Sequence, residues 1–245
     1  MKNNYPVEIR DTWTAPAGSG VALITMPNVP RPLHGLPPRK IMGQAKWDTM
    51  RKRCYYNAHY KCEICGAEPP KGQLHAHELY TINYTDGTSE FNRCIAICKQ
   101  DHDFIHSGRL VTLYKQGNPL YPKSYVLSVV EKGFKLIHDI NEKYGIELKA
   151  YATFLEYLKV PSLRMEMERL IEKYNIKFYS EPKKIAKWGD WRLIWKGKEY
   201  ATPYKNKEEW EAAMVEYGKQ DTKRQATNPF TGEGFDMWDE ILKKS

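Results

Sequence analysis

The chain has 245 residues, of which 41% are hydrophobic and 13% aromatic, and this share of apolar side chains excludes a largely disordered protein. A mean hydropathy of -0.68 and a longest N-terminal apolar run of only residues 21–26 exclude an integral membrane protein and a secretion signal, so we expect a cytoplasmic protein without a membrane partner. The net charge of +8 permits a polyanionic partner, but the charges form no dense basic block, so charge alone does not select nucleic acid.

Residues 1–45 are predicted to form an irregular arm that wraps the part of the chain that follows. Prolines recur throughout this arm, and each one fixes the φ angle and removes a backbone donor. They are Pro6, Pro16, Pro27, Pro30, Pro32, Pro37 and Pro38. A helix is predicted next, from about residue 44 to 60, because Trp47, Met50 and Cys54 recur at helical spacing.

Cysteine motifs follow this helix. The spacing Cys62-Glu-Ile-Cys65 lets one turn offer two thiolates to a tetrahedral zinc ion, and a second turn that begins at Cys98 would close such a site. The chain has five cysteines, an odd number, and four of them lie in this candidate metal-binding segment, which suits a reducing compartment better than a disulfide framework.

A β-hairpin is predicted between the two cysteine motifs. Residues 73–84 and 91–97 are expected to be its strands, with a turn at residues 86–87. His75 and His77 are two residues apart, so both would lie on the same face of the first strand.

A helix is predicted after Cys98. His102 and His106 are four residues apart and would share one face of it. The helix is expected to end near Ser107-Gly108, because glycine tolerates the left-handed conformation of a helix C-terminus.

The middle of the chain is predicted to be helical. Ser124 is expected to cap a helix that Gly145 ends, and a second helix should cover about residues 150–158. A third helix should begin at Ser162 and turn these residues inward: Leu163, Met167, Leu170, Ile171 and Tyr174. These apolar faces indicate core packing rather than chemistry.

A tryptophan-rich hairpin and helix are predicted near the C-terminus. Residues 191–195 and 198–200 flank a Lys196-Gly197 turn, and Asn206 should cap the helix that follows. Four tryptophans lie here among lysines and arginines: Trp188, Trp191, Trp195 and Trp210. Such an arrangement either grips nucleic acid or forms the core of a small unit, and the second interpretation is favoured.

The order of the motifs resembles the HNH family of nucleases, over residues 55–110. Leu-His-Ala-His-Glu from residue 74 and Ile-His-Ser-Gly-Arg from residue 105 are similar to HNH proteins of bacteriophages. The resemblance implies an α+β fold built on a zinc-stapled ββα-metal module. Five units are expected: a proline-rich arm (residues 1–45), the HNH-like zinc module (46–115), a helical region (116–180), a β-hairpin plus helix (181–220), and a linker with a short terminal helix (221–245).

The resemblance also implies a structural zinc site. Its ligands would be three thiolates and one carboxylate: Cys62, Cys65, Cys98 and Asp101. The family usually has a fourth cysteine where this chain has Asp101. Because thiolate is the more usual ligand of a closed zinc site, Cys94 or His102 is an alternative fourth ligand.

An HNH-like site would hydrolyse DNA phosphodiester bonds and leave 5′-phosphate and 3′-hydroxyl ends. The resemblance implies His77 as the general base and a divalent ion, Mg²⁺, Mn²⁺ or a similar metal, held by His102 and His106. His75 would orient phosphate or contribute a ligand. Asn92 is the best match to the middle asparagine of the family.

DNA is the expected partner, and Lys99 and Arg109 are the residues expected to contact its phosphates. RNA is an alternative substrate, because no residue of the chain reports on a 2′-hydroxyl group. The sequence does not indicate an oligomeric state.

The chain departs from the family pattern before the strand histidine, where Ala76 replaces an Asp or His that usually binds the ion. A shifted assignment, with His77 as ligand and Glu78 as base, would restore the ligand. The alternative function is a non-catalytic zinc protein that binds nucleic acid or inhibits a host protein. Ala76 and Asp101 are the features that favour this alternative.

Overall fold

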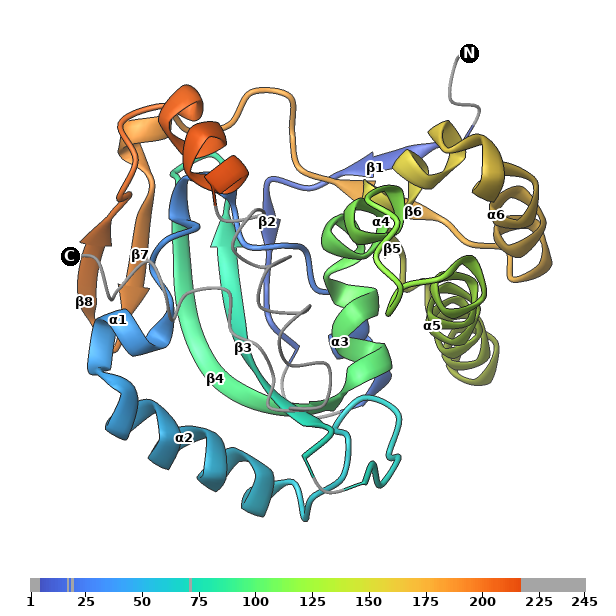
Figure 1. Cartoon of the computed structure of the whole chain (residues 1–245), viewed down its shortest axis with the longest axis horizontal. Helices are drawn as coiled ribbons and strands as arrows, with labels where there is room; N and C mark the ends of the chain where they lie inside the picture. Colours follow the sequence, from blue (N-terminus) through green and yellow to red (C-terminus); the bar gives the residue numbers. More distant parts are fainter. Residues whose placement is uncertain (1–4, 17, 19, 71, 217–245) are drawn as a thin grey trace.

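The structure is a computed structural model that describes residues 5–16, 18, 20–70 and 72–216. These residues form a mixed α+β fold that contains two sheets (Figure 1). The larger sheet has the strand order β2-β3-β4-β7-β8, and the smaller one has the order β1-β6-β5. The predicted α+β class is therefore confirmed.

The larger sheet is built on a long hairpin of β3 (Leu74–Asn83) and β4 (Thr88–Cys98). The turn between these strands places Gly87 at φ 73, in the left-handed region that glycine adopts without strain. The hairpin and its turn were both predicted from the sequence. The second strand begins earlier than expected, because residues from Thr88 onward already pair with β3.

A bulge interrupts this hairpin. Leu79 lies opposite Arg93 and Tyr80 lies opposite Phe91, so Asn92 is an extra residue on β4. The asparagine matched to the middle position of the HNH pattern therefore occupies the bulge.

The two faces of the hairpin are covered by different helices. His75 and His77 pair with Ile97 and Ile95, and paired residues share a face of the sheet. Helix α3 contacts the hairpin, as does α2, and Figure 1 shows these helices on opposite sides of it. Their bounds are Lys99–Ile105 for α3 and Gln44–Asn57 for α2. The helix predicted from residue 44 is confirmed.

The chain continues as helix beyond α3. Helix α3 ends at Ile105, close to the predicted end at Ser107-Gly108. The chain then begins a second helix, α4 (Ser107–Lys115), so the predicted role of Gly108 as the stop is wrong. The physical reason is that Leu110 and Val111 are buried and give α4 an apolar face of its own. Glycine at position 108 therefore lies inside a helix and does not end one.

Three helices contribute many side chains to the main core, which is the larger cluster of buried apolar residues. They are α5 (Lys123–Tyr144), the 3₁₀ helix η3 (Ala152–Lys159) and α6 (Pro161–Lys173). Gly145 ends α5 in the left-handed conformation, as predicted. The N-cap of α5 is Pro122, so the cap predicted at Ser124 is wrong. The side chains predicted to face inward from α6 are buried, which confirms that face: Leu163, Met167, Leu170, Ile171 and Tyr174.

The proline-rich arm contains short regular elements, so the expectation of an irregular arm is wrong in part. These are β1 (Val7–Ile9), β2 (Thr12–Trp13), the 3₁₀ helices η1 (Val21–Thr25) and η2 (Arg31–Leu33), and α1 (Pro38–Met42). The small sheet adds β5 (Ala150–Tyr151) and β6 (Phe178–Ser180). Strand β1 has only three residues and pairs in parallel with β6, which lies far away in the sequence. The local sequence therefore does not reveal what stabilises this strand.

The predicted C-terminal hairpin is confirmed, as β7 (Arg192–Trp195) and β8 (Lys198–Ala201), after the 3₁₀ helix η4 (Trp188–Asp190). Strand β7 pairs in parallel with β4, so the hairpin extends the larger sheet. Trp191 and Trp195 are 0% and 4% exposed in a second core, which confirms that they pack inside. A further helix occupies residues 207–216.

The linker and short terminal helix predicted over residues 221–245 lie outside the described residues. Within the described part of the chain, every helix is too short or too polar to cross a lipid bilayer.

Candidate functional site

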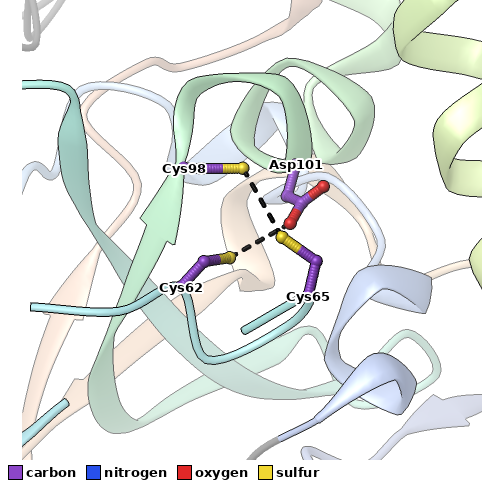
Figure 2. Close-up of side chains that lie close together, drawn as sticks. All are labelled: Cys62, Cys65, Cys98 and Asp101. Atoms are coloured by element: carbon purple, nitrogen blue, oxygen red, sulfur yellow. Dashed lines mark hydrogen bonds between the residues drawn. The ribbon is translucent and has the colours of Figure 1, made fainter. Parts of the chain in front are cut away.

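Three cysteines and one aspartate converge where the hairpin meets α3. Cys62 and Cys65 lie in the segment between α2 and β3, Cys98 ends β4, and Asp101 is in the first turn of α3. One ligand atom of each side chain lies within 4.8 Å of those of the other three. Figure 2 shows the four side chains pointing toward one another. We call these four residues the cysteine cluster.

The spacing in the cysteine cluster fits a tetrahedral ion. The Sγ atoms of Cys65 and Cys98 are 3.9 Å apart. Two thiolates bound to one zinc ion at about 2.3 Å each would be about 3.8 Å apart. The Cys62 thiol donates a hydrogen bond to Oδ2 of Asp101 at 3.0 Å, so both groups direct ligand atoms to the same point. The cluster can therefore hold a metal ion, and sulfur-rich ligand sets of this kind suit zinc.

Asp101 is the candidate fourth ligand that the structure places beside the three thiols. Cys94 lies opposite Glu78 on the hairpin, and its thiol interacts with Cys54 rather than with the cluster. His102, the other alternative, belongs to a second cluster described below.

Contacts within the cysteine cluster shift the pKa values of its members in opposite directions. Hydrogen bonding with the neighbouring thiols of Cys62 and Cys65 lowers the pKa of Cys98 well below its usual value. Hydrogen bonding with Cys65, and then with Cys98, raises the pKa of Cys62. Burial raises the pKa of Asp101, and the Cys65 thiol acts in the same direction. Metal binding would have to displace the remaining protons, so we expect it to strengthen as pH rises.

Three histidines form a second cluster on the same hairpin and helix. His77 lies on β3, His102 on α3, and His106 at the junction of α3 and α4. One ring nitrogen of each lies within 4.8 Å of those of the other two. The ring centroids are 5.2 Å apart for His77 and His102, 4.9 Å for His77 and His106, and 4.6 Å for His102 and His106. We call these three residues the histidine cluster.

Burial favours the neutral form of the three histidines, which is the form that binds metals. Burial is the largest cause that lowers the pKa of His77, His102 and His106, and for His106 the pKa falls to about 4. Neutral imidazole is the ligand form of histidine. Three histidine ligands are also a set that leaves a position open for water or substrate, as catalytic metal sites require.

A small cavity adjoins this cluster. Its volume is about 10 Å³, which is close to the minimum that holds one water molecule. The walls include His77 and His106 from the cluster, Glu78 from β3, and residues 26–29 of the proline-rich arm. The arm therefore helps to enclose the buried side of the histidine cluster.

His75 lies beside the histidine cluster without belonging to it. Its ring stacks on that of His102, with centroids 4.8 Å apart and an angle of 19° between the ring planes. It is more exposed than His77, which is 6% exposed. Burial is the largest cause that lowers the pKa of His75, and the nearby charges of Asp103, Lys99 and Arg109 also act on it.

Those three charged residues form a network next to His75. The Asp103 side chain is 4% exposed and accepts hydrogen bonds from the Lys99 ammonium and, at 2.6 Å, from the Tyr125 hydroxyl. The Arg109 guanidinium is 3.9 Å from the other oxygen of Asp103. The two cations predicted to contact phosphate are therefore brought together by a buried aspartate.

Sequence reasoning missed Asp103 and Tyr125 as members of the site. The four-residue spacing of Lys99 and Asp103 was a signal for an ion pair on one helix face. Tyr125 gave no such signal, because it reaches the network from α5, which follows later in the chain.

Two other predicted site residues lie at the margin. Asn92 occupies the bulge, where its side-chain oxygen accepts a hydrogen bond from the Thr81 hydroxyl at 3.2 Å, and it contributes no atom to the histidine cluster. Glu78 lines the small cavity, although strand alternation directs it away from the face of His75 and His77.

Comparisons of the chain with protein-family models, with curated proteins and with solved structures found no match.

Proposed function

We propose that the chain is a metal-dependent nuclease that hydrolyses phosphodiester bonds of DNA. The observation that supports this most is the histidine cluster, three neutral imidazoles whose ligand atoms lie within 4.8 Å of one another. The histidine cluster lies on the β3–β4 hairpin and on α3, which the cysteine cluster also connects. A structural ion would thus fix the two elements that carry the catalytic ligands.

A divalent ion in the histidine cluster would neutralise charge on the phosphate and assist the departure of the 3′ oxygen. His77, His102 and His106 are the residues proposed to hold it. This set restores the ligand that Ala76 does not provide, because His77 serves as a ligand and not as the base. The close approach of His77 to both helix histidines supports this choice.

His75 is proposed as the general base. It lies on the same strand face as His77 and stacks on a proposed ligand, so an unbound ring nitrogen is available next to the ion. Lys99 and Arg109 are proposed to contact the phosphate, because the Asp103 carboxylate holds both cations near His75. Glu78 is the competing base, which a Glu78→Gln variant tests.

Cleavage of supercoiled plasmid by the pure full-length protein tests this function. With Mg²⁺, Mn²⁺, Ni²⁺ or Zn²⁺ supplied separately, we expect nicked or linear DNA with at least one ion and none with chelator. The product ends should be 5′-phosphate and 3′-hydroxyl. Folded protein with its cysteine cluster loaded that cleaves plasmid with none of these ions would contradict the proposal. Cleavage of RNA alone would change the substrate and leave the site assignment intact.

A further inference from the structure

The ammonium group of Lys132 touches three of the four side chains of the cysteine cluster. Lys132 lies on α5, in a part of the chain distant from the cysteine motifs, and its side chain is 27% exposed. Its Nζ atom is 2.7 Å from Oδ1 of Asp101 and 3.3 Å from the Sγ atoms of both Cys65 and Cys98. A lysine that reaches three candidate ligands from another helix is part of the site and not a surface charge.

The charge of the ligand set gives this contact a function. Three thiolates and one carboxylate carry four negative charges, so a bound divalent ion would leave two in excess. Asp101 is 1% exposed, and excess charge is strongly unfavourable where water cannot solvate it. One ammonium halves this excess. Its hydrogen bonds to sulfur also draw negative charge away from the two thiolates that it contacts.

We propose that Lys132 is the cationic partner of a metal ion bound by the cysteine cluster. Its ion pair holds Oδ1 of Asp101, which leaves Oδ2 directed toward Cys62, where the ion would lie. In this way an aspartate serves where a fourth thiolate is usual. The role concerns the cysteine cluster alone, and it holds whether or not the histidine cluster catalyses cleavage.

Lys132 could also have the opposite role, as a competitor of the metal ion, and an experiment must distinguish the two roles. An ammonium this close to three ligand atoms would also fill their shared space in metal-free protein, and it would then compete with the ion. A partner strengthens metal binding, whereas a competitor weakens it. Replacing Lys132 by an uncharged residue therefore changes metal affinity in opposite directions under the two roles.

Zinc affinity of the full-length protein, measured by competition with a chromogenic chelator, is the test. We expect Lys132→Met to bind zinc about 10- to 100-fold more weakly, as is usual when a residue that supports metal ligands is lost. Lys132→Arg should keep most of the affinity, because it keeps the charge. Lys135→Met is the matched control, since Lys135 lies on the same helix and pairs with Asp139 at the surface. Zinc binding by Lys132→Met that is unchanged or tighter would overturn the proposal.

A second measurement covers the case in which Lys132→Met does not fold. In the cobalt-loaded protein, Lys132→Gln should shift the sulfur-to-cobalt charge-transfer bands, because it loses the ammonium that polarises two thiolates. Lys132→Arg should shift them less. Bands in Lys132→Gln that coincide with those of the unmodified protein would equally overturn the proposal.

Discussion

Replacing Cys62 with serine is expected to remove one zinc ion from the protein and to unfold the hairpin and α3. Cys62 is 2% exposed and packs in the main core, so the loss of the ion and the disruption of the core act together. If free zinc exceeds its dissociation constant about 1000-fold, binding alone contributes about 4 kcal/mol to the free energy of unfolding. Zinc content by elemental analysis and thermal melting with and without chelator measure both effects.

Cys54→Ser is the matched control for this variant. Cys54 is also a buried cysteine, at 7% exposed, but it belongs to α2 and lies outside the cysteine cluster. The Cys54→Ser variant should lose some folding stability because its core packing changes, but it should still bind zinc and still be destabilised by chelator. Equal zinc content in Cys62→Ser and Cys54→Ser would contradict a metal site at Cys62, as would a melting temperature of the unmodified protein that chelator leaves unchanged.

Replacing His102 with alanine is expected to lower DNA cleavage by about 10³-fold or more, since an ion at a scissile phosphate supplies several kcal/mol of transition-state stabilisation. His102 touches both other members of the histidine cluster, so its loss leaves two ligands. Zinc in the cysteine cluster should stay, because no sulfur ligand is changed. Single-turnover cleavage with the most effective ion measures the loss.

Comparison of His75→Ala with His102→Ala distinguishes the proposed general base from a proposed metal ligand. His75→Ala should lower the cleavage rate about 10²- to 10⁴-fold and change its pH profile, while the affinity for the catalytic ion stays the same. His138→Ala is the control, because His138 contacts Tyr174 in the helical half, far along the chain from the cluster. Full activity in His102→Ala, or a metal affinity that falls in His75→Ala and not in His102→Ala, would contradict the roles proposed here.

Local patterns in the sequence predicted the features that depend on a single helix, strand or turn. The helical spacing of Leu163, Met167 and Leu170 predicted the buried face of α6, and the Lys196-Gly197 turn predicted the C-terminal hairpin. The two-residue spacing of His75 and His77 predicted a shared strand face in the same way. In each case the period of the backbone determines which side chains lie together.

Contacts between distant segments were not predictable in this way. Strand β1 pairs with β6 and β4 with β7, both in parallel. Strands β1, β6 and β7 have only three or four residues, so they leave no local pattern that would reveal their partners. The same limit applies to the site. Lys132 and Tyr125 enter it from α5, and only the packing of α5 against α3 brings them near Asp101 and Asp103.

The central claim is that the cysteine cluster binds a metal ion and thereby holds the histidine-bearing hairpin against α3. X-ray absorption at the zinc edge, combined with elemental analysis of purified full-length protein, tests it most directly. We predict one tightly bound zinc ion per chain, with three sulfur neighbours at about 2.3 Å and one oxygen neighbour at about 2.0 to 2.2 Å. Protein that is folded and free of metal, or zinc surrounded only by nitrogen and oxygen, would contradict the claim.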